Sequence, residues 1–221
     1  MLTIQLLGGF QLAIDGEVLP GLTKPRGQSL LAYLLLYSDT PQSRAHLAYT
    51  FWPDTSDSQA RTNLRRELHQ LRQAHPLFAE NLHSDGQHVQ WRMPAGSTVD
   101  AVRFQQLLQE AGQAVDDASR KACYQNAIDL YQGDLLPGLY DEWVLTKREE
   151  LQQAFIQALE VLTKLQMADR DYAAAVSLTQ RLLQHDPLYE AGYAQLMQLM
   201  LQNERACFPA HLSYLRHHFG A

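Results

Sequence analysis

The chain has 221 residues, of which 46% are hydrophobic and 19% are charged, so it can bury the core of one large or two ordinary globular domains. No apolar run approaches the ~20 residues of a membrane span, and the two cysteines form no CxxC pair, which favours a cytoplasmic protein with buried thiols. The net charge of −6 lies entirely in the second part, because residues 1–98 carry eight basic and eight acidic side chains.

Short antiparallel strands are predicted at the start of the chain, in residues 2–22. The stretches LTIQLLG and FQLAIDG are separated by a Gly8-Gly9 pair, and Asp15-Gly16 is typical of a hairpin turn. This pattern predicts two or three strands.

Two helices are predicted next. Thr23 is a suitable N-cap for the first, which has Pro25 in its first turn and continues to about Tyr37. Ser43 can cap the second helix, Arg44–Phe51, which a Trp-Pro pair ends because proline disfavours helix in the residue before it.

A third helix, residues 57–75, is rich in arginine and is called the arginine helix below. Leu64, Leu68 and Leu71 fall at i, i+4 and i+7, so they define one apolar face. Basic side chains lie mostly on its other faces: Arg61, Arg65, Arg66, His69 and Arg72.

A β-hairpin is predicted after the arginine helix, in residues 81–93, with Asp85-Gly86 at its turn. A short helix, an arginine-rich helix and a hairpin, in this order, are typical of a winged helix-turn-helix that places its recognition helix in the DNA major groove. Such a neutral domain should bind DNA weakly as a monomer, so we expect a homodimer or a tandem site.

From Asp100 onward the sequence predicts only amphipathic helices. The expected ranges are Asp100–Val115, Ser119–Tyr131, Asp141–Ala168, Tyr172–His185, Leu188–Gln202 and about Arg205–Phe219. Equivalent turns begin at residues 169 and 203, which are 34 residues apart, the period of a tetratricopeptide repeat. The predicted fold is therefore an α+β winged helix-turn-helix over residues 1–97, followed by an all-α, tetratricopeptide-like domain over residues 98–221.

Several segments resemble one bacterial family. LLGGFQLAIDGEVL, TKPRGQSLLAYLLL, SRAHLAYTFWPD and SQARTNLRRELHQLR, followed by YQGDLLPGLYDEWVLTKREELQQAFIQALEVL and DPLYE, resemble the antibiotic-regulatory-protein-type activators with a bacterial transcriptional activator domain. The resemblance implies a transcriptional activator that binds double-stranded promoter DNA and recruits RNA polymerase. Because an ATPase module often follows this point in long family members, a short regulator and an N-terminal fragment of a larger ATPase-linked regulator both stay open.

Basic residues on the predicted reading elements are the candidate DNA contacts. The start of the first helix could hold a phosphate, and the hairpin could reach the minor groove or phosphates. The candidate residues are Lys24, Arg26, Arg44, Arg61, Arg65, Arg66, His69, Arg72, His88 and Arg92.

Other classes of function receive less support from the sequence. The carboxylate pairs Asp141-Glu142 and Glu149-Glu150 lack a neighbouring nucleophile or metal ligand set, and the glycines form neither a P-loop nor a dinucleotide fingerprint. We therefore expect no enzyme, no cofactor, no metal and no membrane contact. Two alternatives stay open: a signalling adaptor that binds proteins through its helical part, and a sensor that binds a small ligand there.

Overall fold

The structure is a computed structural model that describes residues 1–19 and 24–203. The chain forms two compact units, one made of Met1–Gln106 and Leu130–Gln152, the other of Leu107–Asp129 and Gln153–Ala221. The sequence predicted a helical part that begins at residue 98. Residues 98–106 and 130–152 of that part belong to the first unit, and its other residues belong to the second unit.

The first unit begins with a four-stranded sheet. Its strands are β1 (Leu2–Gln5), β2 (Gln11–Ile14), β3 (Glu17–Val18) and β7 (Thr98–Val99), in the order β3-β2-β1-β7. The predicted antiparallel strands are confirmed, and Gly8 and Gly16 have the positive φ values that their turns require. Strand β7 was not predicted; it pairs in parallel with β1.

Four helices follow: α1 (Pro25–Leu36), α2 (Arg44–Phe51), α3 (Asp57–Ala74) and α4 (Pro76–Asn81). Helix α2 has the predicted bounds, and the Ser43 hydroxyl accepts the predicted capping hydrogen bond, from the backbone N–H of His46. Thr23 lies outside the described residues, and the N-cap position of α1 belongs to Lys24. Pro76 ends α3, as its missing N–H requires, but also starts the unpredicted helix α4.

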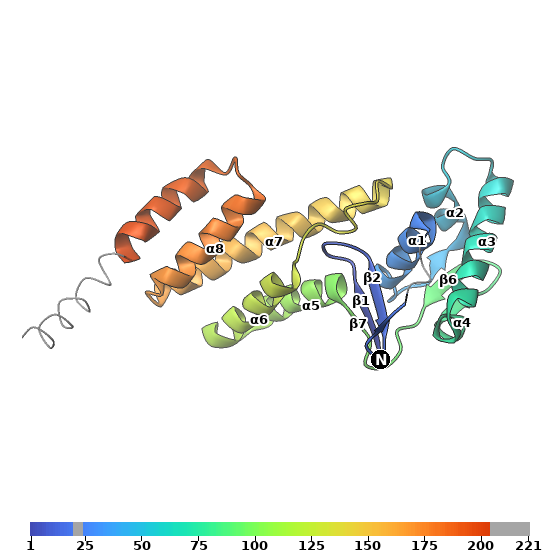
Figure 1. Ribbon diagram of the computed structural model, residues 1–221, viewed down its shortest axis with the longest axis horizontal. Coiled ribbons are helices and arrows are strands. Elements are labelled where there is room, and N and C mark those ends of the chain that lie inside the picture. Colours follow the sequence, from blue (N-terminus) through green and yellow to red (C-terminus); the bar gives the residue numbers. More distant parts are fainter. Residues whose placement is uncertain (20–23, 204–221) are drawn as a thin grey trace, which may run out of the picture. The chain divides into compact units, whose positions relative to one another are not determined.

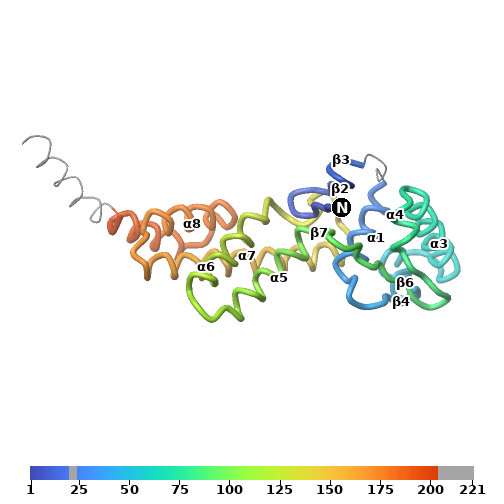
Figure 2. The backbone as a smooth tube through the Cα atoms, turned by 90° about the horizontal axis from the view of Figure 1, so that it is seen from below, coloured from blue at the N-terminus to red at the C-terminus, as the bar shows by residue number. Residues whose placement is uncertain are grey.

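The predicted hairpin is confirmed as β5 (Leu82–Ser84) and β6 (His88–Trp91), which is called the wing below. An unpredicted third strand, β4 (Gln42–Ser43), pairs with β6 directly before α2. Trp91 is fully buried, and its ring meets Phe78 of α4 edge-on at 5.4 Å. In Figures 1 and 2, β6 lies beside α3 and α4, which completes the winged helix fold.

The loop after α6 (Asp117–Leu130) attaches to the N-terminal sheet within the first unit. Leu135 forms a β-bridge with Leu7, and the backbone N–H of Gly8 donates to the backbone carbonyl of Asp134 at 2.9 Å. Gly133 has φ +154°, and a Cβ atom there would lie 3.1 Å from the Gly8 Cα. Only glycine fits this close approach without displacing the backbone.

The second unit is entirely helical in its described part. It contains the later turns of α5 (Asp100–Gln113), most of α6, the later part of α7 (Glu142–Ala168) and α8 (Tyr172–His185), and residues 190–203 are also helical. The predicted bounds of α8 are confirmed, and those of the other described helices shift by one or two residues. The segment Arg205–Phe219 lies outside the described residues.

Polar contacts join the helices of the second unit. The Arg181 guanidinium of α8 donates to the Ile128 carbonyl of α6 at 2.8 Å, and the Tyr189 hydroxyl donates to Glu160 of α7 at 2.8 Å. This packing of consecutive helix pairs is tetratricopeptide-like, as predicted. Across residues 1–19 and 24–203, no helix is long and apolar enough to cross a membrane.

Candidate nucleic-acid interface

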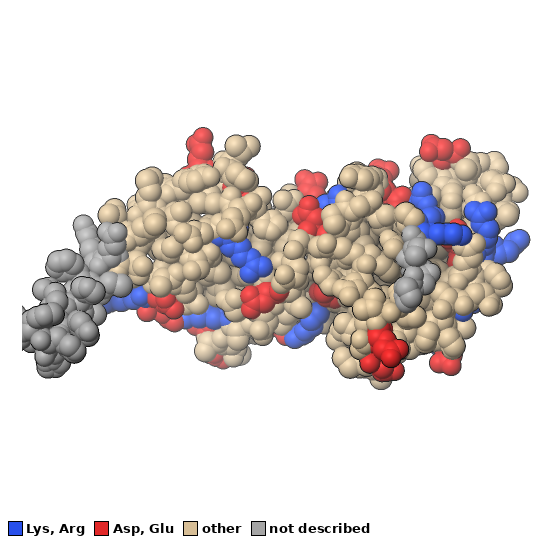
Figure 3. Space-filling view, viewed as in Figure 1, with Lys and Arg blue, Asp and Glu red and all other residues tan. Residues whose placement is uncertain are grey.

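Helix α3 separates its apolar and basic side chains as its sequence period predicts. Leu64, Leu68 and Leu71 are each about 1% exposed and pack into the core. Arg61, Arg65, Arg66 and His69 are exposed. Ser56 caps the helix, and its hydroxyl accepts from the Gln59 backbone N–H. Figure 3 shows several basic side chains gathered over the α3 part of the surface.

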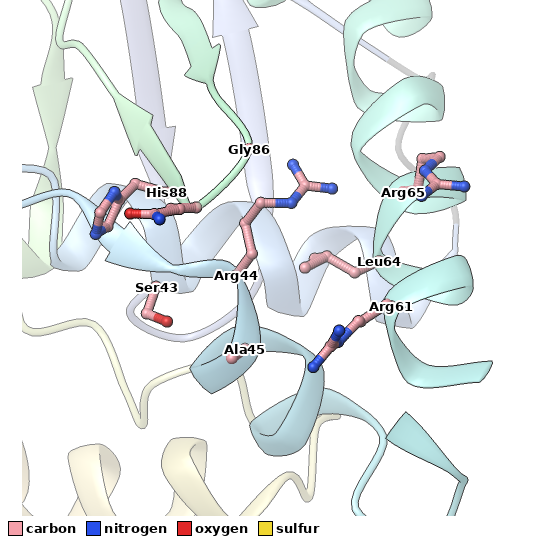
Figure 4. Close-up of a pocket in the computed structure, with 9 residues that line it drawn as sticks. Ser43, Arg44, Ala45, Arg61, Leu64, Arg65, Gly86 and His88 are labelled. Atoms are coloured by element: carbon pink, nitrogen blue, oxygen red, sulfur yellow. The ribbon is translucent and has the colours of Figure 1, made fainter. Parts of the chain in front are cut away.

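Three segments that are distant in sequence surround a surface hollow of about 410 Å³. The start of α2 contributes Arg44, the first half of α3 contributes Arg61 and Arg65, and the wing turn contributes His88. Figure 4 shows these four basic side chains around the hollow, which is called the basic hollow below. The residue types were predicted from the sequence, but their meeting in one hollow was not.

The basic hollow concentrates positive charge. Burial, followed by the nearby charges of Arg65 and Arg72, lowers the pKa of Arg44. The negative charge of Asp85 in the wing turn raises the pKa of Arg44, but this is the smallest of the contributions. Like charges crowded in a partly buried place repel one another, and a bound anion relieves the repulsion. The hollow is therefore chemically suited to an anionic group such as a phosphate.

The turn of the wing is held by Asp85. Its carboxylate accepts hydrogen bonds from the backbone N–H groups of Gln87 (2.7 Å) and His88 (2.6 Å), and these bonds lower the pKa of Asp85. The backbone N–H of Arg44 donates to the Gln87 carbonyl at 2.8 Å. The wing turn is thus fixed to the beginning of α2, which places His88 beside Arg44.

Arg72 joins α3 to the wing through hydrogen bonds to β5. Its guanidinium donates to the Leu82 carbonyl at 3.1 Å and to the Ser84 hydroxyl at 2.7 Å. These bonds occupy part of its donor set, so the structure assigns it a role in orienting the wing. Arg92 is exposed just after β6, and its backbone N–H donates to the Asn81 carbonyl at 2.9 Å.

The two basic residues at the start of α1 have different surroundings. Lys24 is exposed, and its ammonium lies 3.5 Å from the Gln70 side-chain oxygen on α3. Arg26 forms an ion pair with Asp141 at 2.6 Å, and its guanidinium lies 5.8 Å from the Trp52 ring centre. Lys24 therefore lies near the arginine helix, while Arg26 is engaged in the packing of the first unit.

Comparisons with known proteins agree with this architecture. Residues 99–207 match the family described as bacterial transcriptional activator domain. The regulatory protein AfsR of Streptomyces coelicolor is 28% identical over 203 residues, which cover 90% of this chain and 20% of AfsR. The chain thus spans about one fifth of that relative.

A solved structure shows the same fold. Mycobacterium tuberculosis EmbR, in complex with a low affinity phosphopeptide, matches with a TM-score of 0.74 and 20% identity over all of this chain and 61% of EmbR. This likeness shows that the winged helix and the helical domain after it occur in the same order in EmbR. These three likenesses agree with the resemblance of this chain to the antibiotic-regulatory-protein-type regulators with a bacterial transcriptional activator domain.

Proposed function

We propose that this chain is an antibiotic-regulatory-protein-type regulator, that it binds double-stranded DNA through α3 and the wing, and that it activates transcription. The observation that carries the proposal is the basic hollow, in which α2, α3 and the wing direct cations to one place. A winged helix inserts its third helix into the major groove and leaves the wing for the flanking backbone. The exposed side of α3 is the only part of that helix free for this contact, because its leucines are buried.

Different residues take different parts in this proposal. Arg61, Arg65 and His69 project from the exposed faces of α3 and are the proposed base or phosphate contacts. Arg44 and His88 bind the phosphate at the basic hollow. The remaining sequence candidates have supporting parts: Lys24, Arg66 and Arg92 as phosphate contacts, Arg72 by orienting the wing, and Arg26 through its ion pair with Asp141.

The helical domain is the proposed activating part. Residues 99–221 carry ten basic and sixteen acidic side chains, a balance that disfavours direct contact with polyanionic DNA. Helix-pair domains offer broad faces for protein contact. We propose that this domain recruits RNA polymerase and supports a homodimer on the promoter. The proposed boundary between the DNA-binding and the activating part lies near residues 97 and 98.

A genomic footprint followed by a binding assay tests the proposal. Footprinting identifies bound DNA, and fluorescence anisotropy then compares that DNA with a shuffled duplex of equal length. We expect the footprint duplex to bind more tightly, and we expect Arg65→Ala to weaken it by about 1–3 kcal/mol if Arg65 forms a bidentate base contact. Lys164→Ala, an exposed α7 cation, is the matched control and should leave affinity unchanged. Equal binding of the two duplexes would reject sequence-specific DNA recognition.

Transcription in vitro tests the activating part. Purified RNA polymerase and the footprint promoter should give more transcript when the full chain is present. A chain that ends at residue 152, and in which a short glycine-serine linker replaces residues 107–129, keeps both segments of the first unit. It should bind the DNA more weakly and should not raise transcription. Activation by this shortened chain as strong as by the full chain would remove the second unit from the proposal.

A further inference from the structure

A second surface cavity lies within the first unit and is lined by the later residues of α2, whereas the start of α2 lines the basic hollow. Its volume is about 540 Å³, which falls in the range of about 300–1,000 Å³ typical of ligand sites. Helices α1 and α2 and the segment 140–150 line it. Aromatic rings form much of its wall, and we call it the aromatic groove: Tyr33, Tyr37, Tyr49, Phe51, Tyr140 and Trp143.

The floor of the aromatic groove is rigid. The Tyr33 ring meets the Trp143 ring edge-on at 5.2 Å and the Phe51 ring at 5.7 Å. The Tyr33 hydroxyl is hydrogen-bonded to the His46 ring at 3.1 Å, and the Trp143 indole donates to Ser29 at 3.2 Å. Rings held in this way form a preorganised surface, so an occupant need not order it on binding.

The charges of the aromatic groove favour a cationic occupant. Four carboxylates and two basic side chains line it, which gives a net charge of −2. Both cations already have partners: Arg26 pairs with Asp141 at 2.6 Å, and Lys147 pairs with Glu150 at 2.8 Å. Asp54 and Glu142 are exposed and make no ion pair with the described residues. These two carboxylates are left to attract a positive charge.

The rim indicates that the occupant is a stretch of polypeptide. Tyr49 is 73% exposed and Tyr140 is 77% exposed, so a ligand confined to the floor would leave both rings in water. A chain segment that crosses the rim would cover them, and tyrosine is enriched at protein interfaces for this reason. A guanidinium stacks on aromatic faces and pairs with carboxylates, which an ammonium does less well.

We propose that the aromatic groove binds an arginine-containing basic segment of a partner protein. An arginine side chain lies between the rings of Tyr49 and Tyr140 and pairs with Glu142. The start of α2 contributes to the basic hollow, and its later residues line the groove. Because α2 has eight residues and is about 12 Å long, the two sites lie close together. A basic partner segment there is attracted by nearby DNA rather than repelled. The proposal itself does not depend on DNA binding.

Peptide binding to the full chain tests this proposal. The probe is a fluorescein-labelled heptapeptide of alternating glycine and arginine, and its control replaces each arginine with citrulline, which has nearly the same shape and no charge. Fluorescence anisotropy should show the arginine peptide binding at least about tenfold more tightly. Glu142→Gln and Tyr140→Ala should each weaken it about two- to fivefold.

Two controls separate the groove from general attraction to an acidic protein. Glu149→Gln removes the same charge from the same helix but outside the groove, and it should leave affinity unchanged. Backbone amide NMR shifts on peptide addition should be confined to the three segments that line the groove, residues 26–37, 46–54 and 140–150. The proposal is overturned if Glu149→Gln acts as strongly as Glu142→Gln, if the shifts fall elsewhere, or if free arginine amide binds as tightly as the peptide.

Discussion

Replacing Asp141 with alanine should destabilise the first unit well beyond the effect of an ordinary surface change. Its carboxylate pairs with Arg26 and accepts the hydroxyl hydrogen of Ser29, which is fully buried and in turn accepts from Trp143. An unsatisfied buried hydroxyl costs about 1–3 kcal/mol. The Arg26 side chain is 39% exposed, so solvent screening limits the loss of its ion pair to about 1 kcal/mol. Together we expect about 2–4 kcal/mol.

Tryptophan fluorescence during urea unfolding measures this effect selectively. The three tryptophans, at positions 52, 91 and 143, all lie in the first unit and so report its unfolding alone. Asp141→Asn, which retains an acceptor oxygen, should lose less than Asp141→Ala. Glu142→Ala, at the neighbouring exposed position, should stay within about 0.5 kcal/mol of wild type. An Asp141→Ala effect no larger than that of Glu142→Ala would refute the reasoning.

Two further changes test contacts of the N-terminal sheet within the first unit, where the Asp100 carboxylate accepts hydrogen bonds from the backbone N–H groups of Leu6 and Leu7. Burial raises the pKa of Asp100. The contribution of this carboxyl to stability is therefore complete below its ordinary pKa and is lost as the pH rises through the raised pKa. Urea unfolding should accordingly show that the stability of wild type relative to Asp100→Asn is larger near pH 4 than at pH 7. The opposite trend would show that the charged form is favoured. Gly133→Ala should lower the free energy of unfolding by about 1–3 kcal/mol, because the new Cβ clashes with Gly8 and the residue has a positive φ. Gly138→Ala, where the new Cβ meets open space, should change it little. Equal melting temperatures of the two variants would contradict the close approach of Gly133 to Gly8.

The sequence predicted the elements whose pattern is local. The leucine spacing of α3, the Ser43 cap of α2 and the Asp85-Gly86 turn each lie within a few residues, and all three are confirmed. Strands β4 and β7 have two residues each, which is too short for an alternating pattern, so only their tertiary pairing defines them.

The roles of individual charged residues were less accessible to sequence reasoning. Arg26 and Asp141 are separated by 115 positions, and nothing local indicates that they pair. Arg72 has the spacing of an exposed helix residue, yet its donors bind the wing because β5 folds back against α3. The arginine pattern therefore predicted a basic surface, whereas the basic hollow required the tertiary fold.

The salt dependence of DNA binding tests the central claim most directly. The affinity of the full chain for its footprint duplex should fall linearly with the logarithm of salt concentration, with a slope set by the number of phosphates neutralised. Arg44 is the proposed phosphate contact at the basic hollow, so Arg44→Ala should weaken binding to all duplexes alike and reduce that slope by about one unit. Lys164→Ala should leave the slope unchanged. A slope that Arg44→Ala does not alter, or that Lys164→Ala alters equally, would contradict DNA binding at the basic hollow.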